Sequence, residues 1–77
     1  MPSKRTLVLL APGFEELEAI AVIGILRRAG VDVVAAGTMS GPVKSAGEVV
    51  IVPEASLNEV LEEPFDLIVL PGGLEGT

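Results

Sequence analysis

The chain has 77 residues, enough for one small domain, and 49% of them are hydrophobic. Its formal net charge of −6 argues against nucleic acid or an anionic membrane as a partner. Cysteine and histidine are both absent, which excludes disulfides, the usual zinc sites and a Ser–His pair within these residues. No apolar run approaches the roughly 18 residues of a membrane span, so we expect a soluble cytoplasmic protein.

The first half of the chain predicts a strand, a helix and a second strand. Residues 7–11 form a continuous apolar run, typical of a strand buried on both faces, and Pro12-Gly13 ends it. Residues 15–29 predict a helix because acids occupy the first turn and arginines the last, the order that suits the helix dipole. Residues 31–36 form the second β-like run.

The second half predicts a further helix and a further strand. Residues 43–52 indicate a hairpin or a short excursion. Ser56-Leu57-Asn58-Glu59 fits the capping box of a helix that Pro64 ends. Residues 66–70 repeat the buried-strand pattern and lead into the turn Pro71-Gly72-Gly73. Strands that alternate with helices predict an α/β fold with a parallel sheet and crossover helices.

Three carboxylates, Glu15, Glu16 and Glu18, follow the first strand directly. Ligands of such sheets bind beyond the carboxyl ends of the strands, so we expect the acids and the Gly72-Gly73 turn to share that edge. Glu15 and Glu16 suit a structural role at the helix start. Glu18 neighbours an apolar stripe and should be partly buried, but spacing alone leaves its role open between structure and chemistry. A backbone N–H of the turn is a candidate anion stabiliser, although a tight turn is the commoner meaning.

The apolar character of the chain exceeds what 77 residues can cover. Residues 19–26 offer no polar helix face, so the helix should be buried on more than one side, against the sheet and against a partner subunit. Two helices cannot cover both faces of so apolar a sheet. We therefore expect residues 1–77 to be the N-terminal portion of one larger α/β domain, inactive and poorly soluble alone. The alternative is a complete mini-domain stabilised by oligomerisation.

Residues 4–18, KRTLVLLAPGFEELE, resemble the opening of the ThiJ/PfpI superfamily, and within it the Parkinson-disease deglycase branch. RRAG at residues 27–30, PEASL at 53–57 and FDLIVLPGG at 65–73 continue the resemblance over essentially the whole chain. The resemblance implies a flavodoxin-like sandwich with a mostly parallel sheet, usually a homodimer, without cofactor or metal. It also implies a reactive cysteine on a nucleophile elbow, further along than Thr77.

The resemblance assigns roles to the residues of the predicted edge. Glu18 matches the glutamate that hydrogen-bonds the cysteine and shuttles its proton. Glu15 and Glu16 match the nearby acids of the motif, and Gly72-Gly73 match the turn whose backbone N–H lies beside the cysteine and supports an oxyanion. Val22 and Gly24 depart from the family, which commonly has a proline and an aspartate in the middle of this helix.

Three functions are therefore weighed for the parent protein. The first is a cysteine-dependent glyoxalase or deglycase that acts on methylglyoxal-type dicarbonyls and glycated adducts in stress protection. The second is a non-catalytic redox-sensing chaperone that works as a dimer. The third is a hydrolase, a peptidase or amidotransferase relative, which would need a histidine beside the cysteine.

Overall fold

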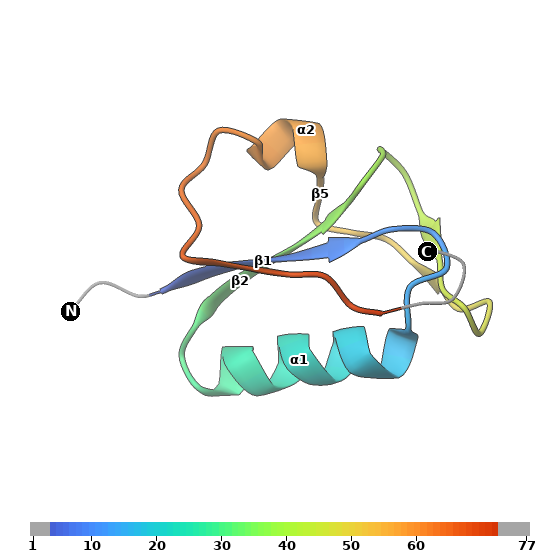
Figure 1. Ribbon diagram of the computed structural model, residues 1–77, viewed down its shortest axis with the longest axis horizontal. Helices are drawn as coiled ribbons and strands as arrows, with labels where there is room; N and C mark the ends of the chain where they lie inside the picture. The colour runs from blue at the N-terminus through green and yellow to red at the C-terminus, as the bar shows by residue number, and fades with distance from the viewer. Residues whose placement is uncertain (1–3, 73–77) are drawn as a thin grey trace.

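The computed structural model describes residues 4–72. Four strands form one parallel sheet in the order β5-β2-β1-β6 (Figure 1). They are β1 (Arg5–Leu10), β2 (Asp32–Gly37), β5 (Ala55–Ser56) and β6 (Leu67–Val69). The central strand β1 pairs with β2 over six residues and with β6 over three, in registers that begin at Arg5↔Asp32 and Thr6↔Leu67. The predicted α/β fold with a parallel sheet is confirmed.

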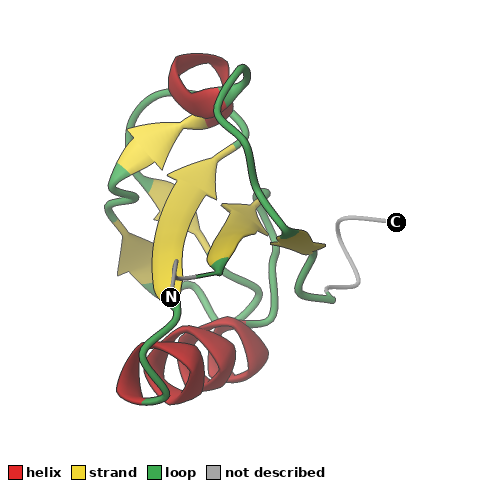
Figure 2. Cartoon of the chain, turned by 90° about the vertical axis from the view of Figure 1, so that its left-hand side faces the viewer, coloured by secondary structure: helices red, strands yellow, loops and turns green. Residues whose placement is uncertain are grey.

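Two helices lie on opposite faces of this sheet, α1 (Glu16–Arg28) and the single-turn α2 (Leu57–Val60) (Figure 2). Successive residues of β1 point to opposite faces, so each helix has its own core. Val8 and Leu10 belong to the cluster beneath α1, together with Phe14 and Ala19. On the other face, Leu7, Ala36 and Val60 form a smaller buried cluster.

The segment predicted as a hairpin or an excursion is a hairpin. β3 (Val43–Lys44) pairs with β4 (Val50–Ile51) antiparallel, as a separate two-stranded sheet. The predicted capping box is also present, since the backbone N–H of Ser56 donates to Glu59 Oε1 over 2.7 Å.

Burial of α1 against a partner subunit stays a prediction, and the described residues bury only one side of the helix. Ala19 is the only residue of α1 that is buried, while Leu17, Ile20 and Ile25 are 78%, 53% and 63% exposed. The sheet covers one side of α1 and the β3–β4 hairpin contacts its first turn at Glu16, which leaves Leu17, Ile20 and Ile25 exposed among the described residues. Three apolar side chains near β6, Leu67, Ile68 and Leu70, are exposed as well.

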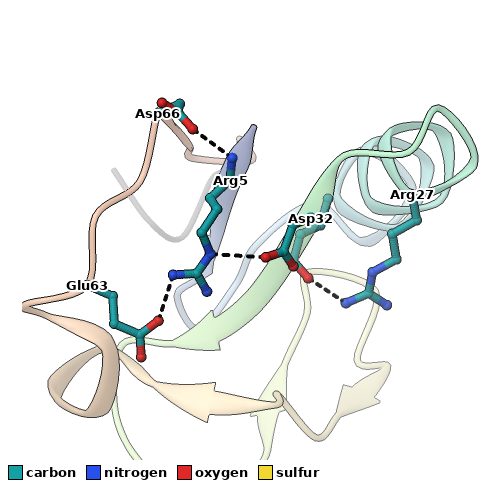
Figure 3. A network of polar contacts seen from close by, with 6 residues as sticks. Arg5, Arg27, Asp32, Glu63 and Asp66 are labelled. Carbon is teal, nitrogen blue, oxygen red and sulfur yellow. Dashed lines mark hydrogen bonds and ion pairs between the residues drawn. The ribbon is translucent and has the colours of Figure 1, made fainter. Parts of the chain in front are cut away.

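A network of charges joins the segments at the amino end of the sheet (Figure 3). The guanidinium of Arg5 donates to Asp32 Oδ2 and to Glu63 Oε1, each over 3.0 Å, and its backbone N–H donates to Asp66 Oδ2 over 2.7 Å. The same guanidinium lies 4.8 Å from the ring centroid of Phe65. Glu63 first, and then Asp32, raise the pKa of Arg5 further above its ordinary value. This network ties the starts of β1, β2 and β6 together.

Arg27 makes a second link of this kind. Its Nη2 donates to Val33 O over 2.9 Å and to Glu54 Oε1 over 2.7 Å, and that carboxylate also accepts the N–H of Ala35. The end of α1 is thereby fastened to β2 and to the segment before β5.

Candidate functional site

The first turn of α1 meets the turn after β6 at the carboxyl edge of the sheet. The backbone N–H of Glu15 donates to Gly72 O over 2.6 Å. In return, the backbone N–H of Gly72 donates to Glu18 Oε1 over 2.7 Å. The expectation that the acids and the glycine turn share one edge is confirmed, whereas Gly73 lies outside the described residues.

Glu18 is the acid that reaches the glycine turn, but its surroundings differ from the prediction. The side chain is exposed and not partly buried, because no described residue covers that side of α1. The N–H of Gly72 already has a partner in Glu18, so this N–H can stabilise another anion only if the carboxylate of Glu18 moves away. Whether Glu18 and Gly72 act in a reaction stays a prediction.

Glu15 has a structural position. It is the N-cap of α1, with an extended backbone, and its side chain accepts the N–H of Leu17 over 2.8 Å. The chain turns into this cap at Gly13, whose φ of +86° lies in the left-handed region that glycine adopts most readily. Phe14 follows and is buried in the core beneath α1, which anchors the turn.

Glu16 points away from Gly72 and contacts the hairpin instead. Its Oε1 accepts the backbone N–H of Gly47 over 3.1 Å. The hydroxyl of Ser45 first, and then the backbone N–H groups of Glu16 itself and of Gly47, hold the pKa of Glu16 below its ordinary value. The carboxylate is therefore ionised at neutral pH.

The β3–β4 hairpin packs directly on the segment that leads into α1. Gly13 N–H donates to Lys44 O over 2.9 Å, and Ala46 N–H donates to Phe14 O over 2.8 Å. The hairpin turn closes with a bond from Glu48 N–H to Ser45 O over 3.0 Å. Glu48 has a φ of +64°, a left-handed conformation that costs a non-glycine residue about 1–2 kcal/mol.

Sequence reasoning missed the place of the hairpin at this edge. The signal that could have found it is Gly47. A Cβ built on Gly47 would collide with the carboxylate of Glu16, so the absence of a side chain at Gly47 permits this close approach, and any larger residue would displace the carboxylate. That signal becomes readable only when the two segments are known to meet.

A hollow of about 130 Å³ lies elsewhere, beside β5. Its lining comprises the loop residues Ser40 and Gly41, residues 52–56, and Glu59 of α2. None of the predicted site residues lines it, so the hollow is separate from the Glu18–Gly72 edge. Within residues 4–72 no three acidic, histidine or cysteine side chains gather as metal ligands would. No described helix has the length and apolarity to cross a membrane.

A parallel sheet between two helices, with a carboxylate at the carboxyl edge of the central strands, defines a flavodoxin-like α/β protein. The model of the DJ-1/PfpI family matches residues 4–77, and the chain belongs to that family. Protein dj-1beta of Drosophila melanogaster is 50% identical over 76 residues, which are 97% of this chain and 41% of that protein. The crystal structure of Drosophila melanogaster DJ-1beta superposes with a TM-score of 0.93 at 49% identity, over 97% of this chain and 41% of that one.

A further relative carries an activity in its name. The glutathione-independent glyoxalase DJR-1.2 of Caenorhabditis elegans is 42% identical over 71 residues, 91% of this chain and 38% of that protein. The chain thus spans about two fifths of the length of these two relatives.

Proposed function

We propose that the protein carrying this chain is a cysteine-dependent glyoxalase or deglycase that acts on methylglyoxal-type dicarbonyls and their adducts. The contact from Gly72 N to Glu18 Oε1, 2.7 Å long, carries the proposal, because it places a carboxylate and a backbone donor together at the ligand edge. The name of the Caenorhabditis elegans relative supports the same reaction. The cysteine and the rest of the domain would come from the part of the protein that the relatives have after the matched segment.

In the proposed reaction, Glu18 moves one proton while the cysteine makes and breaks one C–S bond. Glu18 takes the thiol proton, and the thiolate attacks the aldehyde carbon of methylglyoxal. The carbonyl electron pair moves to oxygen, and Glu18 returns its proton there. Transfer of the aldehyde-derived C–H proton to the neighbouring carbonyl carbon through an enediol gives a thioester, which water hydrolyses to lactate. The sum is methylglyoxal plus water to lactate and one proton, with no external oxidant or reductant.

The test compares Glu18→Leu with Glu62→Leu in the full-length protein. Glu62 is exposed, and within residues 4–72 it makes no side-chain hydrogen bond or ion pair. Loss of a general acid–base group lowers turnover by roughly 10²–10⁴-fold, so lactate formation without glutathione should fall that far in Glu18→Leu alone. Unchanged turnover in Glu18→Leu would remove Glu18 from the mechanism.

A second candidate function is a redox-sensing chaperone that works as a homodimer. The exposed apolar side chains of α1 favour it, because an apolar surface of that kind suits a partner subunit or an unfolded client. Holding activity that survives replacement of the nucleophilic cysteine would support this function, and strict dependence on the cysteine would count against it. No described residue favours the peptidase or amidotransferase reaction.

A further inference from the structure

The first turn of α1 is held from two opposite sides by two of its own carboxylates. Residues two apart on a helix point about 200° away from each other. Glu16 accordingly reaches the hairpin turn at Gly47, and Glu18 reaches the turn after β6 at Gly72. Figure 1 shows the hairpin and the end of β6 at the same end of the sheet as the start of α1.

The β3–β4 hairpin is also hydrogen-bonded to the segment just before α1. Backbone bonds of 2.9 and 2.8 Å join it to Gly13 and Phe14, just before the helix. The contact of Glu16 with Gly47 is so close that a methyl group on Gly47 would displace the carboxylate. The hairpin turn next to Gly47 is closed by the bond from Glu48 N–H to Ser45 O over 3.0 Å. The hairpin is therefore hydrogen-bonded to the segment that begins α1, and Glu16 is the only side chain of α1 that bonds to it among the described residues.

We propose that Glu16 is a positioning residue, which braces the first turn of α1 against the hairpin at Gly47 and thereby keeps Glu18 in hydrogen-bonding distance of Gly72. This inference rests on the proposed function only where it gives Glu18 a chemical role; the bracing itself is a structural statement. Among the described residues, Glu16 forms no hydrogen bond with Glu18 or Gly72. It acts through the helix turn that it shares with Glu18.

The ionised state of Glu16 strengthens the brace. A carboxylate accepts an N–H about twice as strongly as a neutral oxygen does. Like any glutamate of ordinary pKa, Glu16 is ionised at neutral pH, and the hydroxyl of Ser45 and the N–H of Gly47 lower its pKa further by stabilising the ionised form. A glutamine at the same position would keep the shape and an acceptor oxygen but lose this charge.

The test measures the NMR chemical shift and the hydrogen-exchange rate of the Gly72 amide in full-length protein labelled with ¹⁵N-glycine. Glu16→Ala should move the Gly72 amide proton upfield and speed its hydrogen exchange by about tenfold, and Glu16→Gln should shift it less in the same direction. Glu48→Gln is the matched control, because it also removes one negative charge, but from the hairpin. The Glu48 side chain makes no hydrogen bond to α1 in the described residues, so this variant should leave the Gly72 amide signal unchanged.

Gly47→Ala disturbs the same contact from the other side. It should shift the NMR signal of the Gly72 amide in the same direction as Glu16→Ala. The double variant should show no further shift, because both substitutions remove the same contact. An unchanged chemical shift of the Gly72 amide in folded Glu16→Gln and in folded Gly47→Ala would overturn the proposal. Additive effects of the two substitutions would also overturn it. These outcomes stand even if the protein has no glyoxalase activity.

Kinetics separate a positioning role from a merely structural one. Glu16→Gln should lower kcat for methylglyoxal about tenfold with KM little changed, because the substrate contacts stay while Glu18 is misplaced. A normal kcat in a variant whose Gly72 amide has moved would overturn the functional part of the inference.

Discussion

Gly72 and Glu18 are 54 residues apart in the chain, yet the N–H of the one donates to the carboxylate of the other over 2.7 Å. The bond joins the first crossover helix to the end of strand β6, two elements that both border the central strand β1. A carboxylate held in this way has a defined direction although it is exposed. Its second oxygen, Oε2, accepts no hydrogen bond from residues 4–72 and stays available to a group that approaches from outside them.

The hydrogen bond from Gly72 N–H to Glu18 can be removed by substituting the residue that donates it. Gly72→Pro deletes this donor, so Glu18 should lose its partner and methylglyoxal turnover by the full-length protein should fall about tenfold. Gly72→Ala is the matched control, because its Cβ would lie 3.6 Å from Glu18 Oε1, an ordinary contact, and the N–H remains. Equal activity of the two variants would contradict a role for the hydrogen bond.

The lowered pKa of Glu16 predicts a pH dependence of stability. A carboxyl group whose folded-state pKa is below its unfolded value stabilises the fold above the ordinary value of 4.5 and loses that contribution as the pH falls through the folded-state pKa. Glu16→Gln should therefore lower the urea midpoint at pH 7 and match the native protein at a pH below the folded value. Midpoints measured across this range check the prediction, and a constant difference between the two proteins at every pH would refute it.

The exposed apolar side of α1 predicts an effect of charge on assembly. Leu17→Arg places a cation among apolar side chains, so the proposed homodimer should dissociate in sedimentation experiments on the full-length protein. Leu61→Arg adds the same charge at an equally apolar exposed site on the far side of the sheet, after α2, and should leave the dimer intact. A dimer that tolerates Leu17→Arg would place the contact elsewhere.

The two phenylalanines of the chain differ in their burial and in their distance from the site. Phe14 is 2% exposed beneath α1, so Phe14→Ala should cost about 3–5 kcal/mol of unfolding free energy. Phe65 is only partly buried at the opposite end, beside Arg5, and Phe65→Ala should cost clearly less. Chemical denaturation measures both, and the reverse order would show that the core under α1 is not the main one.

Most of the fold could be predicted because it follows from local patterns. The apolar runs, the acids and arginines at the ends of α1, and the capping box at Ser56 each depend on residues close in sequence. The parallel sheet then brings Glu18 and Gly72 to one edge by topology alone. Membership of the DJ-1/PfpI family agrees with the resemblance carried by the motifs.

The remaining features depend on which surfaces meet, and local patterns do not contain that information. The apolar composition of α1 suggested burial on several sides, but composition does not say what covers a helix, and Leu17 and Ile25 are exposed. The contact between Glu16 and Gly47 joins residues 31 positions apart and depends on a missing Cβ. Gly47 could equally have served an ordinary hairpin turn.

The charge network around Arg5 (Figure 3) is at the start of β1, whereas Glu18 lies beyond the end of that strand. The strands of this fold are thus fastened where they enter the sheet, by contacts that involve none of the residues at the exit edge. Such a separation lets the exit edge vary in sequence while the scaffold persists. An engineer could replace Glu18 or the hairpin turn to seek new chemistry and still rely on Arg5, Asp32 and Glu63 to keep the strands aligned.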